Sequence, residues 1–338
     1  MKKKKSICHA LEFAKQNHID KPWIQDLKRC DQEFKRSYGR LKEKGIIQEE
    51  WETENLSRMT FTVNRWLTSK QCYSITEALA EDLFAMEDLS FPLDAMHLPF
   101  PCFYLDMEPF SEDFDDVPGA KLLGYYVIID EVPYGEDAVA SCCSIVILAM
   151  MEDGTYVYGG AVFDYDPDHM EQDLNETVAR LSGHIPEQRK HFARALLFAA
   201  YLSSEQPEVT ENGTQKQIYR PSAKPKYSSI RKWDVGIRYM QEKQAYEKKQ
   251  ESGETGGKVA ENNSISETSI TAAEEKSGPR RNPPRPHMRR AHWQTYRTGK
   301  GRTGKKVLWI PPVTVGMPKN RKQEDIPVVI RERKEKKE

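Results

Sequence analysis

Residues 284–316 read PRPHMRRAHWQTYRTGKGRTGKKVLWIPPVTVG, and this stretch decides the fold that we expect for the end of the chain. Two runs rich in aromatic and apolar side chains, 288–296 and 307–310, flank a basic connection, 298–304, that contains three glycines. Glycine takes positive φ at little steric cost, so the pattern predicts a β-hairpin. Pro311 and Pro312 have no N–H to donate and should end the ladder.

An isolated hairpin is only marginally stable in water, so this one needs a sheet to lie against. We expect Val307, Trp309 and Ile310 to dock it on a core that the preceding chain forms.

The same stretch is strongly basic. Cations beside stackable rings are typical of surfaces that bind RNA or single-stranded nucleic acid. The alternative is a solvated edge strand whose charges protect it from aggregation. The candidate residues for binding nucleic acid or another partner are Arg285, His287, Arg289, Arg290, His292, Trp293, Tyr296, Lys300 and Arg302.

The net charge of −1 hides a division of charge along the chain. From residue 279 onward there are 18 lysines and arginines against 5 acidic residues, a net of +13, which leaves a net of −14 for residues 1–278. Residues 77–116 hold twelve acidic residues and no lysine or arginine. We interpret this acidic stretch as a docking face for a basic partner, one candidate being the chain's own basic arm.

The chain of 338 residues, 38% hydrophobic, is long enough for two domains or for one large domain with appendages. Its six cysteines form no C-x-x-C pair, so reduced thiols are the default. Residues 1–5 resemble the start of a signal peptide, but His9, Glu12 and Lys15 interrupt the apolar region that it would need. No apolar run is long enough for a membrane span, and we expect a soluble cytoplasmic protein.

The order of the elements predicts an α+β fold. Residues 6–67 have helical patterns, and Ser74-Ile75-Thr76-Glu77 has the spacing of a capping box before a helix that should run to about Leu89. Four strand-like runs then predict an antiparallel meander; they are 101–107, 122–130, 138–151 and 154–163. Further helices are expected over 168–181 and 186–203, and a strand over 230–235 precedes a polar helix.

We therefore expect a helical region, an antiparallel β-rich core with flanking helices, a disordered linker, and a basic aromatic hairpin that docks on the core, followed by a charged tail. The linker lacks aromatic residues and cannot bury enough surface to offset the entropy of ordering. The five parts span 1–95, 96–249, 250–280, 281–318 and 319–338.

The run RPHMRRAHWQTYRTGKGR, followed by KKVLWIPPVTVG, resembles the C-terminal signature of the type V anti-CRISPR family that suppresses production of the Cas effector nuclease. The resemblance implies a protein of a phage or mobile element that acts in the cytoplasm of a bacterial host cell. It also implies recognition of the nascent effector polypeptide during translation, with lowering of its mRNA and protein. The mRNA or the ribosome is a further candidate partner.

Two other classes stay open beside this resemblance: a nucleic-acid-binding accessory protein of a plasmid or phage without a CRISPR role, and a direct ribonuclease. A ribonuclease needs an acid and a base or a metal held together. His287 and His292 are five residues apart and fall on opposite faces of a strand, so shared metal ligation is not expected. We expect no catalytic residues, no metal and no cofactor, and therefore a protein that is not an enzyme.

Overall fold

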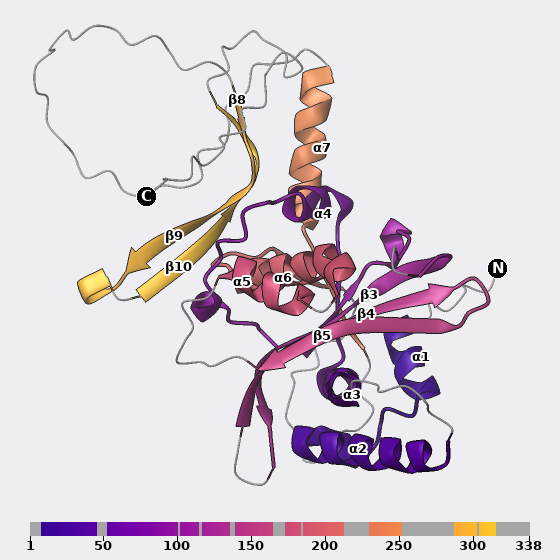
Figure 1. The fold of residues 1–338 in the computed structure, drawn as a ribbon. Coiled ribbons are helices and arrows are strands. Elements are labelled where there is room, and N and C mark those ends of the chain that lie inside the picture. The colour runs from indigo at the N-terminus through magenta and orange to yellow at the C-terminus, as the bar shows by residue number, and fades with distance from the viewer. Residues whose placement is uncertain are drawn as a thin grey trace, which may run out of the picture.

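A computed structural model describes residues 8–45, 53–100, 102–114, 117–135, 139–164, 173–183, 185–212, 230–251, 287–302 and 304–315 of the chain. A seven-stranded mixed sheet has helices on both faces, and a long two-stranded ladder lies beside the helices of one face (Figure 1). The predicted α+β class is confirmed.

One half of the sheet is the predicted antiparallel meander, with each strand paired to the next along the chain. Short connections favour this arrangement because antiparallel neighbours can be joined by tight turns. Gly154, in the turn between the last two strands, has a φ of +87°, as the Asp153-Gly154 signal predicts. The strands are β2 (Cys102–Asp106), β3 (Ala120–Pro133), β4 (Val139–Met151) and β5 (Tyr156–Asp164).

The other half of the sheet makes it mixed. Strand β1 (Gln71–Ile75) lies between β2 and β7 (Arg231–Val235) and is parallel to both. Strand β6 (Val209–Asn212) pairs antiparallel with β7, and the full order is β5-β4-β3-β2-β1-β7-β6. The parallel pairing of β1 with β2 arises because the chain between them contains a helix and returns to the starting end of the sheet, so the antiparallel part of the core is the meander.

The central strands are apolar on both faces. Along β3, Tyr125 and Val127 belong to one hydrophobic cluster, while Tyr126 and Ile128 belong to another on the opposite face. Both clusters are buried because helices cover both faces, so the run lacks the polar alternation of a sheet with one solvated face.

Three N-terminal helices cover one face of the sheet (Figure 1). Trp66 lies edge-on to Tyr126 with ring centroids 5.5 Å apart, and its indole N–H donates to the carbonyl of Gln71 at 2.8 Å. The Asp26 side chain accepts from the backbone N–H of Arg29 and so caps the second helix. The helices are α1 (His9–Gln16), α2 (Leu27–Glu43) and α3 (Thr53–Ser69).

The opposite face is covered by α4, α5 and α6, with α7 beside α4 (Figure 1). Helix α6 is buried along most of its length, and Phe198 lies edge-on to Tyr73 and Phe103, at 5.7 Å from each. The four helices are α4 (Glu77–Phe84), α5 (Leu174–Ser182), α6 (Arg189–Ser203) and α7 (Ile237–Glu251). Short 3-10 turns lie at Pro22–Gln25, Leu93–Ala95, Glu108–Phe110 and Pro186–Gln188.

The predicted capping box at Ser74 is wrong. Ser74 lies in β1, paired with Asp106 and Asp234 in the neighbouring strands. Helix α4 begins at Glu77, and the Thr76 hydroxyl donates to the carbonyl of Gly236 at 3.0 Å instead of capping the helix. Strand pairing over a long sequence distance therefore overrides the local helix signal, and α4 ends at Phe84, before Leu89.

The predicted C-terminal hairpin is present as β9 (His292–Thr298) and β10 (Gly304–Ile310), joined through a turn at Lys300–Arg302. Strand β10 ends at the two prolines, as expected. Pairing resumes beyond them, between β11 (Val313–Val315) and β8 (His287–Arg289). The single strand expected over 288–296 is therefore interrupted between β8 and β9.

The division of the chain into five parts stays a prediction. Helix α7 extends to Glu251, and the rest of the expected linker lies outside the described residues, as does the charged tail 319–338. The hairpin shares its buried residues Ala291, Trp293 and Val307 with the hydrophobic cluster of the main sheet.

Candidate functional site

The inner face of the hairpin is packed against the core. Trp293 is 8% exposed and lies edge-on to Phe91, with ring centroids 5.1 Å apart. Across the ladder, Trp309 pairs with Trp293, and Val307 is buried beside them. The alternation of a strand places these three side chains on one face.

Trp309 is half-buried on an aromatic platform. Its ring lies edge-on to Tyr201 at 5.6 Å and to Tyr239 at 5.5 Å, and its indole N–H faces the Met86 sulfur at 3.3 Å. Ile310 is half-buried, and as the next residue along β10 it points to the opposite face. Of the three residues chosen as docking residues, Val307 and Trp309 thus contact the main cluster.

Two ion pairs and a backbone hydrogen bond join the hairpin to the body of the protein. Arg290 forms an ion pair with Glu87 at 3.1 Å, and Lys306 forms one with Glu205 at 2.7 Å. The backbone N–H of Glu205 also donates to the carbonyl of Val307 at 3.0 Å. Since Glu87 belongs to the acidic stretch 77–116, one cation of the basic arm meets this stretch.

The tip of the hairpin differs from its base. Arg297 and Lys300 are exposed, and no ion pair joins either to a carboxylate of the described residues. Tyr296 is 42% exposed beside them. The ladder carries these side chains away from the sheet and its helices (Figure 1). Two cations of the hairpin, Arg290 and Lys306, thus pair with carboxylates, whereas Arg297 and Lys300 near the turn remain available.

The other candidates are spread along the C-terminal arm. Arg289 is exposed at the end of β8, and His292 is half-buried with Nδ1 3.1 Å from the Arg290 carbonyl. His287 pairs through its backbone with Val315. Arg302 is placed by its backbone in the turn, and Arg285 lies outside the described residues.

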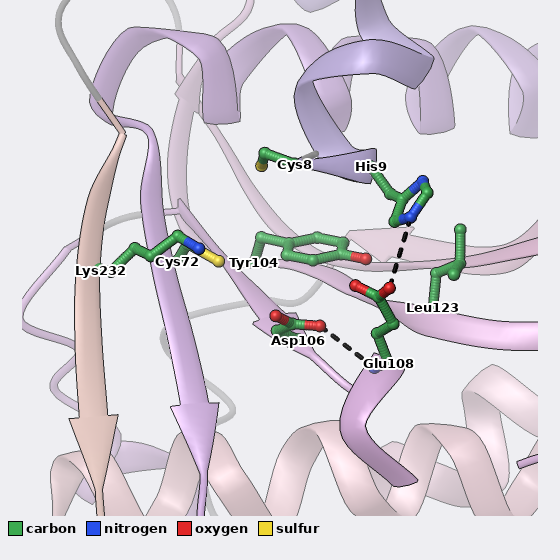
Figure 2. A pocket seen from close by; sticks show the side chains of 8 residues that line it. All are labelled: Cys8, His9, Cys72, Tyr104, Asp106, Glu108, Leu123 and Lys232. Carbon is green, nitrogen blue, oxygen red and sulfur yellow. Dashed lines mark hydrogen bonds and ion pairs between the residues drawn. The ribbon is translucent and has the colours of Figure 1, made fainter. Parts of the chain in front are cut away.

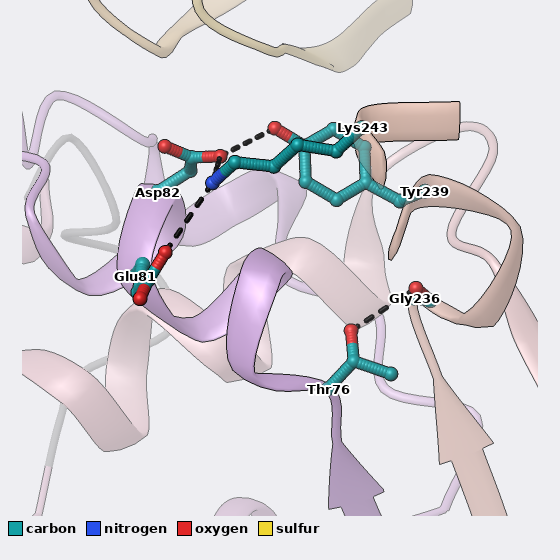
Figure 3. Close-up of polar contacts among 6 residues, drawn as sticks. All are labelled: Thr76, Glu81, Asp82, Gly236, Tyr239 and Lys243. Carbon is teal, nitrogen blue, oxygen red and sulfur yellow. Dashed lines mark hydrogen bonds and ion pairs between the residues drawn. The ribbon is translucent and has the colours of Figure 1, made fainter. Parts of the chain in front are cut away.

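A polar cluster on α4 and α7 supports the aromatic platform under Trp309 (Figure 3). Lys243 contacts Asp82 at 3.0 Å and Glu81 at 3.3 Å, and the Tyr239 hydroxyl donates to Asp82 at 2.5 Å. Burial, followed by the hydrogen bond to Asp82, raises the pKa of Tyr239, so its hydroxyl stays a donor. Sequence reasoning missed this cluster, although the i, i+4 spacing of Tyr239 and Lys243 places both on one helix face.

The described residues offer no metal centre, since they hold no group of three or more His, Cys, Asp or Glu side chains that could bind an ion. In the same part of the chain, every helix is too short or too polar to cross a membrane. What the arrangement can do is bind: a hairpin docked on the core through Trp293, Val307 and Trp309 presents exposed cations and the ring of Tyr296 near its turn.

Comparisons with known proteins bear on this site. The model of the AcrVA2-like family, described as the anti-CRISPR type V subtype A2 family, matches residues 73–317 and so includes the whole described hairpin. The crystal structure of AcrVA2 superposes with a TM-score of 0.50 over 91% of this chain and 99% of that chain, at 16% sequence identity. At that identity the likeness shows the fold alone. No curated protein matches the sequence.

Proposed function

The chain belongs to the AcrVA2-like anti-CRISPR type V subtype A2 family, and from that premise we propose that it recognises the nascent type V effector polypeptide and lowers its mRNA and protein. It acts by binding in the bacterial host cell, as a protein of a phage or mobile element. The target peptide is read by the sheet, and the hairpin tip contacts RNA of the translating complex.

The observation that carries the proposal is the difference between the paired and the unpaired cations of the hairpin. Arg290 and Lys306 pair with carboxylates, whereas Arg297 and Lys300 project beside the exposed ring of Tyr296. Cations that make no ion pair are free to neutralise phosphates, and an exposed ring can stack on an unpaired base. Cations that served only solubility would not need a docked hairpin to hold them away from the body of the protein.

An edge of the sheet supports peptide recognition. Strand β5 is one of the two edge strands of the sheet, and no strand of the described residues pairs with its outer side. An extended peptide can add to such an edge through main-chain hydrogen bonds, with specificity supplied by neighbouring side chains. Tyr158, 37% exposed on β5, offers an apolar contact at this edge. A nascent chain leaving the ribosome is unfolded and suits this mode of binding.

A variant pair tests the role of the tip. Arg297→Ala with Lys300→Ala should weaken association with ribosome–nascent chain complexes, because two phosphate contacts are lost. The slope of log affinity against log salt concentration should fall by about 0.7–0.9 for each contact. Binding of the isolated effector peptide should be unchanged, and effector mRNA in cells should rise.

Lys35→Ala with Arg40→Ala serves as the matched control, since it removes the same charge from the exposed face of α2 on the far side of the sheet. If both double variants weaken association equally, the effect is one of net charge and the proposed role of the tip is wrong.

A direct ribonuclease is the competing function. The His292 ring contacts the carbonyl of Arg290, and none of the described acidic side chains is hydrogen-bonded to it. We therefore expect purified protein to leave effector mRNA intact in the absence of ribosomes. Cleavage of naked RNA that His292→Ala abolishes would replace the binding proposal with a nuclease.

A further inference from the structure

A small pocket lies between α1 and the first strands of the sheet (Figure 2). Helix α1 covers the face of the sheet away from the hairpin (Figure 1). Its volume is about 30 Å³, while one water needs roughly 10–15 Å³. Two thiols, a lysine, a tyrosine and two carboxylates converge on it. The lining residues are Cys8, His9, Cys72, Tyr104, Asp106, Glu108, Leu123 and Lys232.

Cys8 is the accessible thiol of this pocket. It is half-buried at the N-cap of α1. A hydrogen bond from the Cys72 thiol, together with the Leu11 backbone N–H and the Lys232 ammonium, lowers the pKa of Cys8 to about 7, against the opposing effects of burial and Asp106. A thiolate forms at neutral pH in such surroundings, and the thiolate is the nucleophile.

The other cysteines differ from Cys8, since all five are buried. Burial raises the pKa of Cys30 to about 12 and places those of Cys102 and Cys143 higher still. The hydrogen bond to Cys8 and burial also raise the pKa of Cys72, which therefore stays a protonated thiol beside the Cys8 thiolate. The chain thus holds one reactive sulfur with a second thiol next to it.

The pocket has the size and the donors for a small oxidant. The Tyr104 side chain is 3% exposed, and its hydroxyl makes no hydrogen bond with any described residue. Burial raises the pKa of Tyr104, so the hydroxyl keeps its proton. The Tyr104 hydroxyl and the Lys232 ammonium can both donate a hydrogen bond to an oxygen atom bound next to Cys8. A molecule of two linked oxygen atoms fits the measured volume.

We propose that this pocket is a peroxide-sensing modification site, in which hydrogen peroxide oxidises Cys8 and Cys72 then closes a disulfide with it. The Cys8 thiolate attacks one peroxide oxygen and the O–O bond breaks. The Cys8 sulfenic acid forms, and the leaving hydroxide takes a proton to become water. Oxidation removes the negative charge of Cys8, which is among the causes that raise the pKa of Cys72. Cys72 then gives up its proton and its thiolate attacks the Cys8 sulfur, and the sulfenic hydroxyl departs with that proton as a second water. Each peroxide thus accepts two electrons, one from each sulfur.

This site is separate from the proposed function. Cys8 and Cys72 precede residue 73, where the match to the anti-CRISPR family begins. The disulfide would join α1 to β1, a central strand of the sheet, and so fix the N-terminal helix to the sheet.

The first test uses the unmodified full-length chain. Treated with hydrogen peroxide at pH 7.4, it should lose two hydrogen masses, and peptide mapping should place one disulfide between Cys8 and Cys72. Under limiting iodoacetamide, Cys8 should be alkylated roughly tenfold or more faster than any other cysteine. Even labelling of all six cysteines, or a disulfide at another pair, would overturn the proposal.

Two variants separate the chemical steps. Cys72→Ser should stop at a Cys8 sulfenic acid that dimedone traps, whereas Cys8→Ser should give neither the adduct nor the disulfide. Cys30→Ser, which removes a buried thiol on α2, is the control and should react like the native chain. A persistent sulfenic acid in the native chain would overturn the role of Cys72.

The role of the donors is tested by comparing two reagents. Tyr104→Phe and Lys232→Gln should slow the reaction with peroxide more than alkylation by iodoacetamide, which has no leaving hydroxide to stabilise. The alkylation rate of the native chain should reach half its maximum near pH 7. The groups that face Cys8 in this range are Cys72 of β1, Tyr104 and Asp106 of β2, Lys232 of β7, Glu108 and His9. An equal effect on both reagents would show that Tyr104 and Lys232 only shape the pocket.

Discussion

Trp293 and Trp309 face each other across the hairpin, but their surroundings differ. Trp293 is buried, and its indole N–H has no hydrogen-bond partner among the described residues. Trp309 is half-buried and has both a polar contact and two aromatic neighbours. Packing is thus the main contribution of Trp293, and we infer that it anchors the hairpin more strongly than Trp309, the anchor that the sequence suggested.

Substitution of Trp293 tests whether this residue anchors the hairpin. Trp293→Ala should lower the free energy of unfolding by about 3–5 kcal/mol, because it leaves a cavity beside Phe91. Trp293→Phe should cost much less, since no hydrogen bond is lost. Tyr296→Ala, at an exposed site on the same strand, should stay within about 0.5 kcal/mol. Urea denaturation measures all three, and equal effects of Trp293→Ala and Tyr296→Ala would mean that the hairpin is not docked.

Among the elements, β5 depends on close contact with β4. Gly160 has a φ of +144°, and a Cβ atom there would lie 2.1 Å from the carbonyl oxygen of Ile145. No side chain can occupy that space, so the glycine allows the two backbones to approach. This contact holds the edge strand that we propose for peptide binding. Gly39, within α2, has nothing within 4 Å of its Cβ position.

Substitution of alanine for Gly160 and for Gly39 should change the stability of the protein in opposite directions. Gly160→Ala should destabilise the protein by at least about 2 kcal/mol, because β4 and β5 must separate. Gly39→Ala should stabilise it by about 0.5–1 kcal/mol, as expected for a helix interior. Thermal melting of the two variants against the native chain checks both signs. A neutral Gly160→Ala would mean that β5 does not lie where we describe it.

At the scale of the whole molecule, apolar contacts rather than charge attach the basic arm to the acidic body. The two ion pairs between the hairpin and the body are solvent-exposed, with Arg290 and Lys306 each 50% exposed at the side chain. Exposed pairs contribute about 0–1 kcal/mol each. The opposite net charges of the basic arm and of residues 1–278 therefore orient the arm more than they hold it.

Hydrogen exchange at high salt tests whether apolar contacts or charges hold the hairpin on the body. In 1 M sodium chloride, where screening acts over about 3 Å, amides of β9 and β10 should keep their protection. In Trp293→Ala the same amides should exchange faster even at low salt. If salt alone abolishes the protection, charge attraction holds the hairpin and the account given for Trp293 is wrong.

The sequence by itself determined the elements whose signals are local: the hairpin between its glycines, the antiparallel meander, and most of the helices. These follow from side-chain period and turn chemistry, which act over a few residues. Only the tertiary structure decided that β1 lies parallel between β2 and β7, overriding the helix signal at Ser74. The tertiary structure also decided which cations pair with carboxylates and that Cys8 and Cys72 line one pocket. Such contacts join segments far apart in the chain. Their free energy depends on packing, which a local sequence pattern does not specify.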